Sequence, residues 1–239
     1  VGSEMCIRDR RRDARASYFS TNLRRFAWAE GCTLDIARSG YWVGFARLWR
    51  CSLKQTIDAR ALMAADLNEP EFQSARILIY GGRNSGKSGL AERFAHRWGA
   101  LVQGANAQAQ LSALCSTVAE EIALGLETTV ATRDEMTVRV ESAAESLGIS
   151  HVLKRNPLEL SGGQSQLAVL ACSAAMQPAV WVIDEPFTGL DDSARIRVLA
   201  LLKEYEGSVV WTSVRPSEAE LNLATHQVKL ASADAVQMT

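Results

Sequence analysis

The sequence GGRNSGKS occupies residues 81–88 and directly follows the apolar run RILIY at residues 76–80. It fits the pattern G-x-x-x-x-G-K-[S/T], in which glycines let successive backbone N–H groups point at phosphate oxygens. Residues 88–98 are predicted to form a helix, and the positive end of that helix would face the same phosphates. A strand, a glycine-rich loop and a helix in this order predict a phosphate-binding P-loop. Its members are Gly81, Gly82, Arg83, Asn84, Ser85, Gly86, Lys87 and Ser88.

Two side chains of this loop are suited to nucleotide chemistry. Lys87 offers a mobile positive charge to the β- and γ-phosphates, which makes it a candidate catalytic group, and the hydroxyl of Ser88 is an oxygen ligand of the type that Mg²⁺ takes. The motif therefore predicts ATP and Mg²⁺ as ligands. A glycine-rich turn with an incidental Lys-Ser pair is the alternative, and the agreement of both flanking elements argues against it.

Two acidic residues follow the apolar run VWVI at residues 180–183. Such a run is typical of a strand buried on both faces of a parallel sheet, and ligands bind α/β sheets at the carboxyl ends of their strands. Asp184 fits the Walker B position, which reaches Mg²⁺ through water, and Glu185 fits a general base for the attacking water. A charged pair ending a surface strand is the simpler interpretation of these two residues alone, but the P-loop favours nucleotide hydrolysis.

Alternating strand and helix patterns across residues 51–239 predict one three-layer α/β domain with a mostly parallel sheet. Helices are predicted at residues 88–98, 117–126, 134–147, 165–176, 193–205 and 217–223, and strands at residues 61–68, 76–80, 180–183, 208–212 and 226–230. Residues 1–10, VGSEMCIRDR, look like a translated sequencing adapter. Residues 1–50 are therefore predicted to be a non-native or poorly ordered leader, with a basic and aromatic surface patch as the alternative.

The composition narrows the choice of partners and compartment. A formal net charge of -1 gives no overall basic field, so nucleic acid is not expected as the main ligand. The sequence contains 5 cysteines, but their spacing suggests neither a disulfide framework nor a zinc site, which favours a reducing cytoplasmic setting. No apolar run reaches the roughly 18 residues that a spanning helix needs, so any membrane role is expected to be peripheral.

The segment LSGGQ at residues 160–164, followed by a helix, a proline and an apolar strand ending in Asp-Glu-Pro, resembles the ATPase subunits of ABC transporters. The resemblance covers roughly residues 61–230. It implies a P-loop NTPase fold with a helical signature subdomain, and a head-to-tail dimer in which each signature closes over the γ-phosphate held by the other subunit. The residues that it implies at the nucleotide are Ser161, Gly162, Gly163, Gln164 and, in a D-loop at residues 189–191, Asp191.

Residues 102–125 resemble the Q-loop region of the cobalt and energy-coupling-factor group, whose members import metal ions and vitamins. The resemblance implies that Gln103 completes the Mg²⁺ shell and senses the γ-phosphate, with Gln108 and Gln110 as alternatives. It also implies that the adjoining segment contacts an integral-membrane transport subunit. The protein is therefore expected in the cytoplasm, on the inner face of the cell membrane.

Three departures from the family pattern have consequences. The short distance from Ser88 to Gln103 leaves room for one helix and one strand, so the family's antiparallel β subdomain is predicted to be reduced. Residues 51–60, some twenty-odd positions before the P-loop, contain no clear aromatic partner for adenine, although Trp49 is a displaced candidate. Ser213 stands where the family usually has a switch histidine, and because serine cannot carry a positive charge, hydrolysis is expected to be impaired.

Together these features predict an ATP-binding and hydrolysing subunit, or half-subunit, of an ABC importer of the energy-coupling-factor type. Two alternatives remain at the level of the sequence. One is a soluble ABC ATPase without a membrane partner, and the other is a degenerate module that binds ATP for regulation without turnover.

Overall fold

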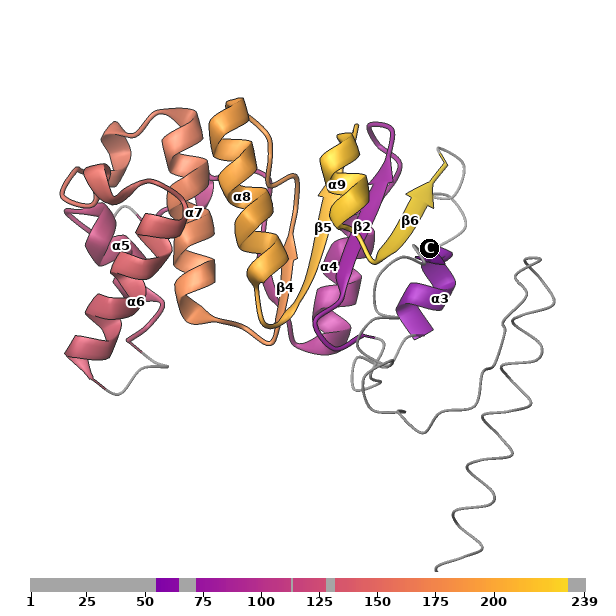
Figure 1. Cartoon of the computed structure of the whole chain (residues 1–239), viewed down its shortest axis with the longest axis horizontal. Coiled ribbons are helices and arrows are strands. Elements are labelled where there is room, and N and C mark those ends of the chain that lie inside the picture. The colour runs from indigo at the N-terminus through magenta and orange to yellow at the C-terminus, as the bar shows by residue number, and fades with distance from the viewer. Residues whose placement is uncertain (1–54, 65–71, 113, 128–131, 232–239) are drawn as a thin grey trace, which may run out of the picture. The chain divides into compact units, whose positions relative to one another are not determined.

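The computed structural model describes residues 55–64, 72–112, 114–127 and 132–231, all of which belong to the unit formed by residues 52–239 (Figure 1). The predictions for the leader and for Trp49 concern residues outside this described part.

A six-stranded sheet forms the centre of the unit. Its strands are β1 (Gln55–Thr56), β2 (Arg76–Gly81), β3 (Leu101–Gln103), β4 (Val180–Ile183), β5 (Ser208–Ser213) and β6 (His226–Leu230). They lie in the order β1-β6-β2-β5-β4-β3, and every pairing is parallel. The predicted α/β class is confirmed, whereas the described residues contain no antiparallel strand pair that would represent a reduced β subdomain.

Helices cover both faces of the sheet. They are α3 (Ala59–Ala64), α4 (Lys87–Trp98), α5 (Val118–Leu124), α6 (Arg133–Ser146), α7 (Gly162–Met176), α8 (Asp192–Glu204) and α9 (Glu218–Leu223). Short 3₁₀ turns occupy Gln108–Gln110, Ser150–Val152 and Pro157–Glu159. None of the described helices is long and apolar enough to cross a bilayer.

Alternation along the strands creates two cores. On β4, Trp181 and Ile183 pack into a core with helices α5 to α8, whereas Val182 packs on the other face with α3 and α4. Successive strand residues point to opposite faces, so a wholly apolar strand supplies both cores at once. Helices α5, α6 and α7 continue beyond the sheet edge as a helical subdomain (Figure 1).

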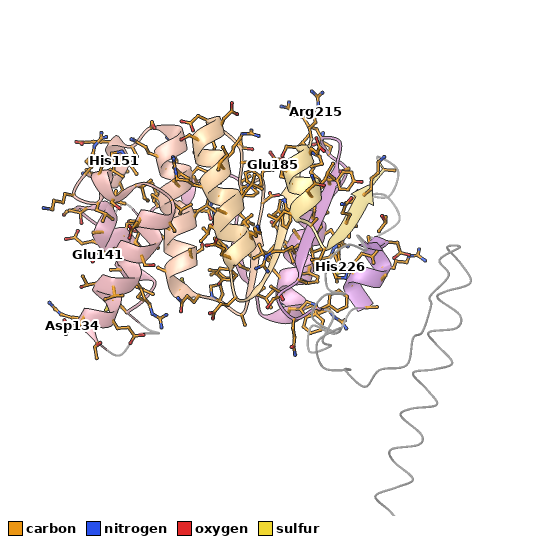
Figure 2. The ribbon with its side chains drawn as sticks, in the orientation of Figure 1. Asp134, Glu141, His151, Glu185, Arg215 and His226 are labelled. Atoms are coloured by element: carbon orange, nitrogen blue, oxygen red, sulfur yellow. The ribbon has the colours of Figure 1, made fainter. Side chains whose placement is uncertain are left out.

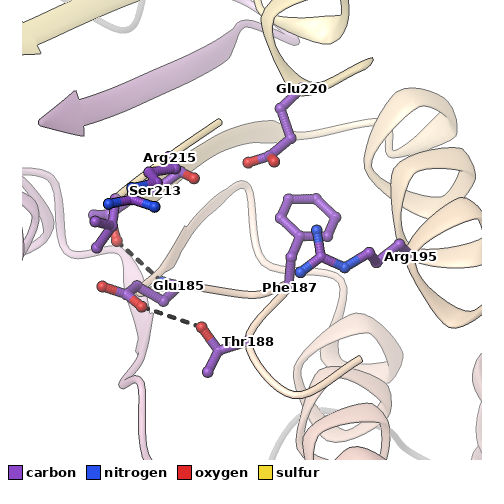
Figure 3. Close-up of a pocket in the computed structure, with 9 residues that line it drawn as sticks. Glu185, Phe187, Thr188, Arg195, Ser213, Arg215 and Glu220 are labelled. Atoms are coloured by element: carbon purple, nitrogen blue, oxygen red, sulfur yellow. Dashed lines mark hydrogen bonds between the residues drawn. The ribbon is translucent and has the colours of Figure 1, made fainter. Parts of the chain in front are cut away.

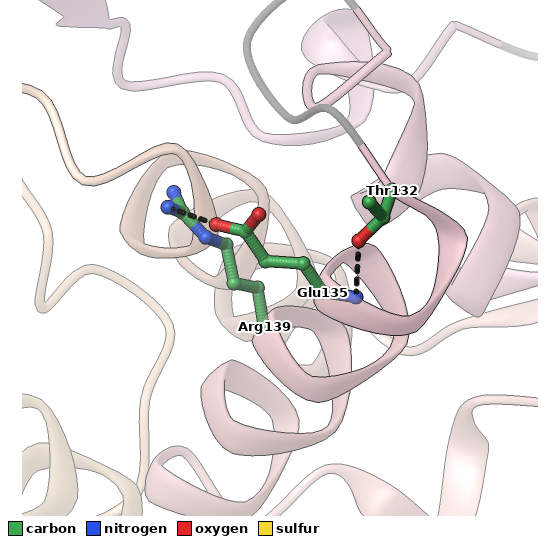
Figure 4. Close-up of polar contacts among 3 residues, drawn as sticks. All are labelled: Thr132, Glu135 and Arg139. Carbon is green, nitrogen blue, oxygen red and sulfur yellow. Dashed lines mark hydrogen bonds and ion pairs between the residues drawn. The ribbon is translucent and has the colours of Figure 1, made fainter.

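Helix α6 of this subdomain shows how local chemistry fixes an element. Thr132 lies at its N-cap and accepts a hydrogen bond from the Glu135 N–H at 3.3 Å. Glu135 pairs with Arg139 one turn later at 2.7 Å (Figure 4). Such caps and pairs stabilise a helix by roughly 1 and 0.3–0.5 kcal/mol respectively.

Two predicted elements were wrong in type or extent. Residues 61–68 were predicted as a strand, but the described portion of this run belongs to α3, because Ala, Leu and Met favour helix. Helix α7 starts at Gly162 rather than at residue 165. A reciprocal capping box between Ser161 and Gln164 starts it early and outweighs the unfavourable helix propensity of the two glycines.

Arg76 lies at the amino-terminal end of β2, where its side chain joins this strand to the end of α8. Its buried guanidinium donates to five backbone carbonyls, those of Ser74, Ala75, Lys203, Tyr205 and Gly207. Burial lowers the pKa of this guanidinium below its usual value. The contacts satisfy the last carbonyls of a helix whose C-terminus attracts a cation.

Replacing Arg76 with Met should therefore reduce the free energy of unfolding by about 3 kcal/mol, because several buried carbonyls lose a charged donor. Chemical denaturation measures the change. The matched control is Arg60→Met on the exposed surface of α3, which should stay within about 0.5 kcal/mol of the parent. Equal effects of the two changes would contradict the role assigned to Arg76.

Candidate nucleotide-binding site

Parallel pairing brings the predicted site residues to one edge of the sheet. Strands β2, β5, β4 and β3 are successive neighbours, so their carboxyl ends lie side by side. Ser213 is in register with Tyr80, which directly precedes the P-loop. Gln103 is in register with Ile183, and its carbonyl accepts a hydrogen bond from the Asp184 N–H at 2.8 Å.

Two glycines of the P-loop, Gly81 and Gly86, are required by the geometry of the backbone. A Cβ atom on Gly81 would lie 2.4 Å from the carbonyl oxygen of Leu230, closer than any real Cβ contact. Gly86 has φ 85° at the N-cap of α4, in the left-handed region that glycine enters without strain. The Lys87 amino group folds back over this loop and donates to the Gly82 carbonyl at 2.8 Å. The loop thus curls around its own lysine at the N-terminus of a 12-residue helix, an arrangement suited to a phosphate chain.

The residues predicted to bind Mg²⁺ fit that ion chemically. Ser88 is exposed in the first turn of α4. Gln103 is 1% exposed, and neither its amide oxygen nor its amide nitrogen has a hydrogen-bond partner. A hydroxyl, a carboxylate at Asp184 and a free amide oxygen are all hard oxygen ligands. The described residues include no cluster of three or more His, Cys, Asp or Glu side chains that could hold a metal ion.

The two alternative glutamines differ from Gln103 in their contacts. The Gln110 amide accepts from the Gly104 N–H at 3.1 Å and donates to the Gly104 carbonyl at 2.7 Å. Gln108 is exposed in the same 3₁₀ turn. Among these three, only Gln103 has a buried and unpartnered amide.

Thr212, which the sequence motifs did not identify, links the two acidic residues. The Thr212 hydroxyl donates to Asp184 Oδ1 and accepts from the Glu185 N–H at 3.0 Å. Glu185 has φ 49°, an unusual left-handed conformation for a non-glycine residue, and Thr188 donates to its Oε2 at 3.1 Å. The available sequence signal was a threonine inside the apolar run SVVWTS, because a hydroxyl in a buried strand needs a hydrogen-bond partner. Thr212 is fully buried in the structure.

A pocket opens beside Glu185 at the ends of β4 and β5. It is lined by Glu185, Phe187, Thr188, Arg195, Thr212, Ser213, Val214, Arg215 and Glu220 (Figure 3). The structure thus brings Ser213 together with the proposed general base. The histidines at 151 and 226 lie elsewhere (Figure 2), and His226 stacks on Phe72 with ring centroids 5.1 Å apart.

The signature segment contacts the loop that follows β4. A Cβ atom on Gly163 would lie 3.1 Å from the Gly189 carbonyl oxygen, and Gln166 donates to the Pro186 carbonyl at 3.3 Å. Asp191 caps α8 by accepting from the Ala194 N–H at 2.7 Å. Signature and D-loop therefore form one packed surface, while the Ser161 hydroxyl and the Gln164 amide are engaged in the capping box.

The segment after β3 is fastened to the helical subdomain. The buried Glu121 carboxylate accepts from the Ser112 N–H at 2.6 Å and from its hydroxyl at 2.8 Å. The Cys172 thiol on α7 donates to the Glu121 carbonyl at 3.7 Å, and burial raises the pKa of this thiol to about 12. Cys115 and Cys172 are both free thiols, and the high pKa of Cys172 makes it a packing residue rather than a nucleophile.

The ABC transporter family profile matches residues 68–188, just over half of the chain. The chain belongs to the ABC transporter family.

Individual relatives extend this result. The energy-coupling factor transporter ATP-binding protein EcfA1 of Levilactobacillus brevis is 38% identical over 89 residues, which cover 37% of this chain and 32% of that protein. The trehalose/maltose import ATP-binding protein MalK of Thermococcus litoralis is 34% identical over 115 residues, 48% of this chain and 31% of that protein. The matched stretches thus span about a third of the length of these curated relatives.

The fold is also that of ABC cassettes. The dimeric structure of MJ0796, a bacterial ABC transporter cassette, superimposes with a TM-score of 0.57 at 18% sequence identity. The superposition covers 67% of this chain and 82% of that one. The predicted P-loop NTPase architecture is therefore confirmed.

Removing the Thr212 hydroxyl should destabilise the acid-bearing edge of the sheet. Thr212→Val leaves the Glu185 N–H without its partner and should cost about 1–3 kcal/mol in unfolding free energy. Thr212→Ser keeps the hydroxyl and loses one methyl group, at about 0.8 kcal/mol. Denaturation curves compare the two variants, and a valine variant that is more stable than the serine variant would contradict this assignment.

Proposed function

We propose that this chain is an ATP-binding and ATP-hydrolysing subunit, or half-subunit, that powers an ABC importer of the energy-coupling-factor type. One observation carries the proposal: the P-loop after β2, the Asp184–Glu185 pair after β4 and Gln103 at the end of β3 lie at the same edge of the parallel sheet. Family membership agrees with a nucleotide ligand at that edge.

In this mechanism the P-loop backbone and the Lys87 amino group bind the β- and γ-phosphates, with Lys87 exchanging the Gly82 carbonyl for phosphate oxygens. Ser88, Gln103 and Asp184 would hold Mg²⁺, which when bound neutralises phosphate charge. Glu185 orients water and accepts its proton. Thr212 holds the Asp184 carboxylate and the Glu185 backbone in place through its two hydrogen bonds, while Thr188 donates to the Glu185 carboxylate.

In the proposed dimer, the signature residues of one subunit contribute to the nucleotide site of the other subunit. Ser161, Gly162, Gly163 and Gln164 lie at the start of a 15-residue helix, and Gly163 packs closely against Gly189 of the D-loop. A head-to-tail dimer with another ABC ATPase subunit would bring them to the partner's γ-phosphate, with Asp191 at the interface. The dimeric structure of the MJ0796 cassette, which has the same fold, supports a dimer.

The energy-coupling-factor assignment rests on sequence. The Q-loop region from Gln103 to Gly125 resembles that group, and EcfA1 is among the relatives. The segment fastened through Glu121 is then placed to contact an integral-membrane subunit, on the cytoplasmic face of the cell membrane. MalK, whose name describes trehalose and maltose import, represents a different importer class at similar identity.

Ser213 favours a second candidate, a degenerate module that binds ATP for regulation without turnover. The serine lines the pocket beside Glu185 and offers no permanent charge there. Measured turnover in an assembled complex separates the two candidates.

Lys87→Ala should abolish measurable ATP binding in calorimetry, because it removes the side-chain cation that the loop encloses. Lys203→Ala on the exposed surface of α8 is the control and should bind like the parent. An ATP affinity of the Lys87 variant within about twofold of the parent would overturn the assignment of the site.

Glu185→Gln should bind ATP normally, lose hydrolysis and prolong the ATP-bound dimer, since an amide cannot accept the proton from water. Single-turnover hydrolysis and size-exclusion chromatography with ATP measure the two effects. Faster hydrolysis by this variant would exclude Glu185 as the base.

A further inference from the structure

We infer that Arg215 supplies the γ-phosphate cation that Ser213 lacks, an inference that rests on the proposed ATPase function. Both residues line the pocket beside Glu185 (Figure 3). Ser213 is the last residue of β5, the strand that lies between β2, which leads into the P-loop, and β4, which leads into the two acids. Arg215 follows two positions later, in the loop after β5.

The guanidinium of Arg215 is available for a ligand. Its side chain is exposed, and within the described part of the chain it forms no hydrogen bond or ion pair. The other arginine of the pocket differs, because Arg195 Nε donates to the Leu190 carbonyl at 3.2 Å. The one ion pair with N–O distance within 4.0 Å among the described residues lies far away in sequence, on α6.

The charges around the pocket also suit this role. Glu185 and Glu220 both face it, and one carboxylate oxygen of Glu220 is buried without a hydrogen-bond partner while the other accepts from Ser217. Two carboxylates in one small pocket would repel a phosphate unless a cation stood between them. Arg215 and Arg195 offset that negative charge.

The guanidinium of Arg215 is better suited to binding the γ-phosphate than the hydroxyl of Ser213 is. Arginine stays charged at all relevant pH values and presents paired donors that match two phosphate oxygens. An arginine at the transferred phosphoryl group stabilises charge that develops in the transition state. Arg215 would thus be a catalytic residue in contact with the γ-phosphate, while Lys87 serves the β- and γ-phosphates from the P-loop.

A binding measurement tests this role independently of turnover. Arg215→Ala should weaken the affinity for a non-hydrolysable ATP analogue by about 10-fold and leave ADP affinity within about twofold, because ADP has no γ-phosphate. Arg133→Ala, an exposed arginine on α6, should change neither affinity. Equal ATP-analogue affinities for the Arg215→Ala variant and the parent would overturn the inference, as would a loss found in Arg195→Ala instead.

Hydrolysis provides a second arm. Arg215→Ala should lower the hydrolysis rate by about 10-fold or more, and Ser213→His in that background should restore much of it, because the imidazole would supply the same contact. The two groups would serve the same role, so the effect of Ser213→His should depend on whether Arg215 is present. An equal increase in the hydrolysis rate on Ser213→His in the parent and in the Arg215→Ala variant would overturn the inference.

The outcomes also separate this inference from the proposed function. If the parent binds no ATP at all, the proposed function itself fails. If the parent binds and hydrolyses ATP and the Arg215→Ala variant behaves like the parent, only this inference fails.

Discussion

The site depends on the parallel pairing of β5 between β2 and β4. Because all three strands run the same way, the loops that follow them emerge at one edge, and a P-loop, two acids and a pocket from distant parts of the chain become neighbours. An antiparallel β5 would send Ser213 and Arg215 to the opposite edge. The apolar surfaces on both faces of β4 and β5 fix this register, since a slip of one residue would exchange the two cores.

Within that frame, a few polar groups in apolar surroundings set the fine geometry. Thr212 is fully buried and links the Asp184 carboxylate to the Glu185 backbone. At the far edge of the sheet, Arg76 ties β2 to the end of α8. Hydrogen bonds of this kind are worth more for orientation than for net stability, because most of their energy replaces contacts with water. They explain how a mostly apolar sheet can hold two acids in a defined position.

Charge distribution distinguishes this site from one built around a switch histidine. The end of β5 carries a small hydroxyl at Ser213 and then a flexible cation at Arg215, both beside Glu185. A guanidinium is permanently charged, whereas imidazole titrates near neutral pH. In the proposed site, the positive charge beside Glu185 therefore comes from Arg215 in place of a histidine at position 213, and the P-loop and the Asp184–Glu185 pair are the same in both cases.

The sequence alone determined the parts that depend on local chemistry. Strand patterns in the sequence located β2, β4, β5 and β6, the P-loop glycines predicted a phosphate-binding loop, and the family motifs led to the correct fold. The strand prediction failed for α3, because periodicity does not separate helix from strand in so short an apolar run and the helix propensity of Ala, Leu and Met was not weighed. The predicted start of α7 was three residues late, because the capping box between Ser161 and Gln164 was overlooked. Only the tertiary structure revealed Thr212 as the link between the acids, the free buried amide of Gln103 and the shared pocket of Ser213, Arg215 and Glu185. These features join residues tens of positions apart, and a side chain's partners across a sheet follow from strand order and packing, which no local pattern encodes.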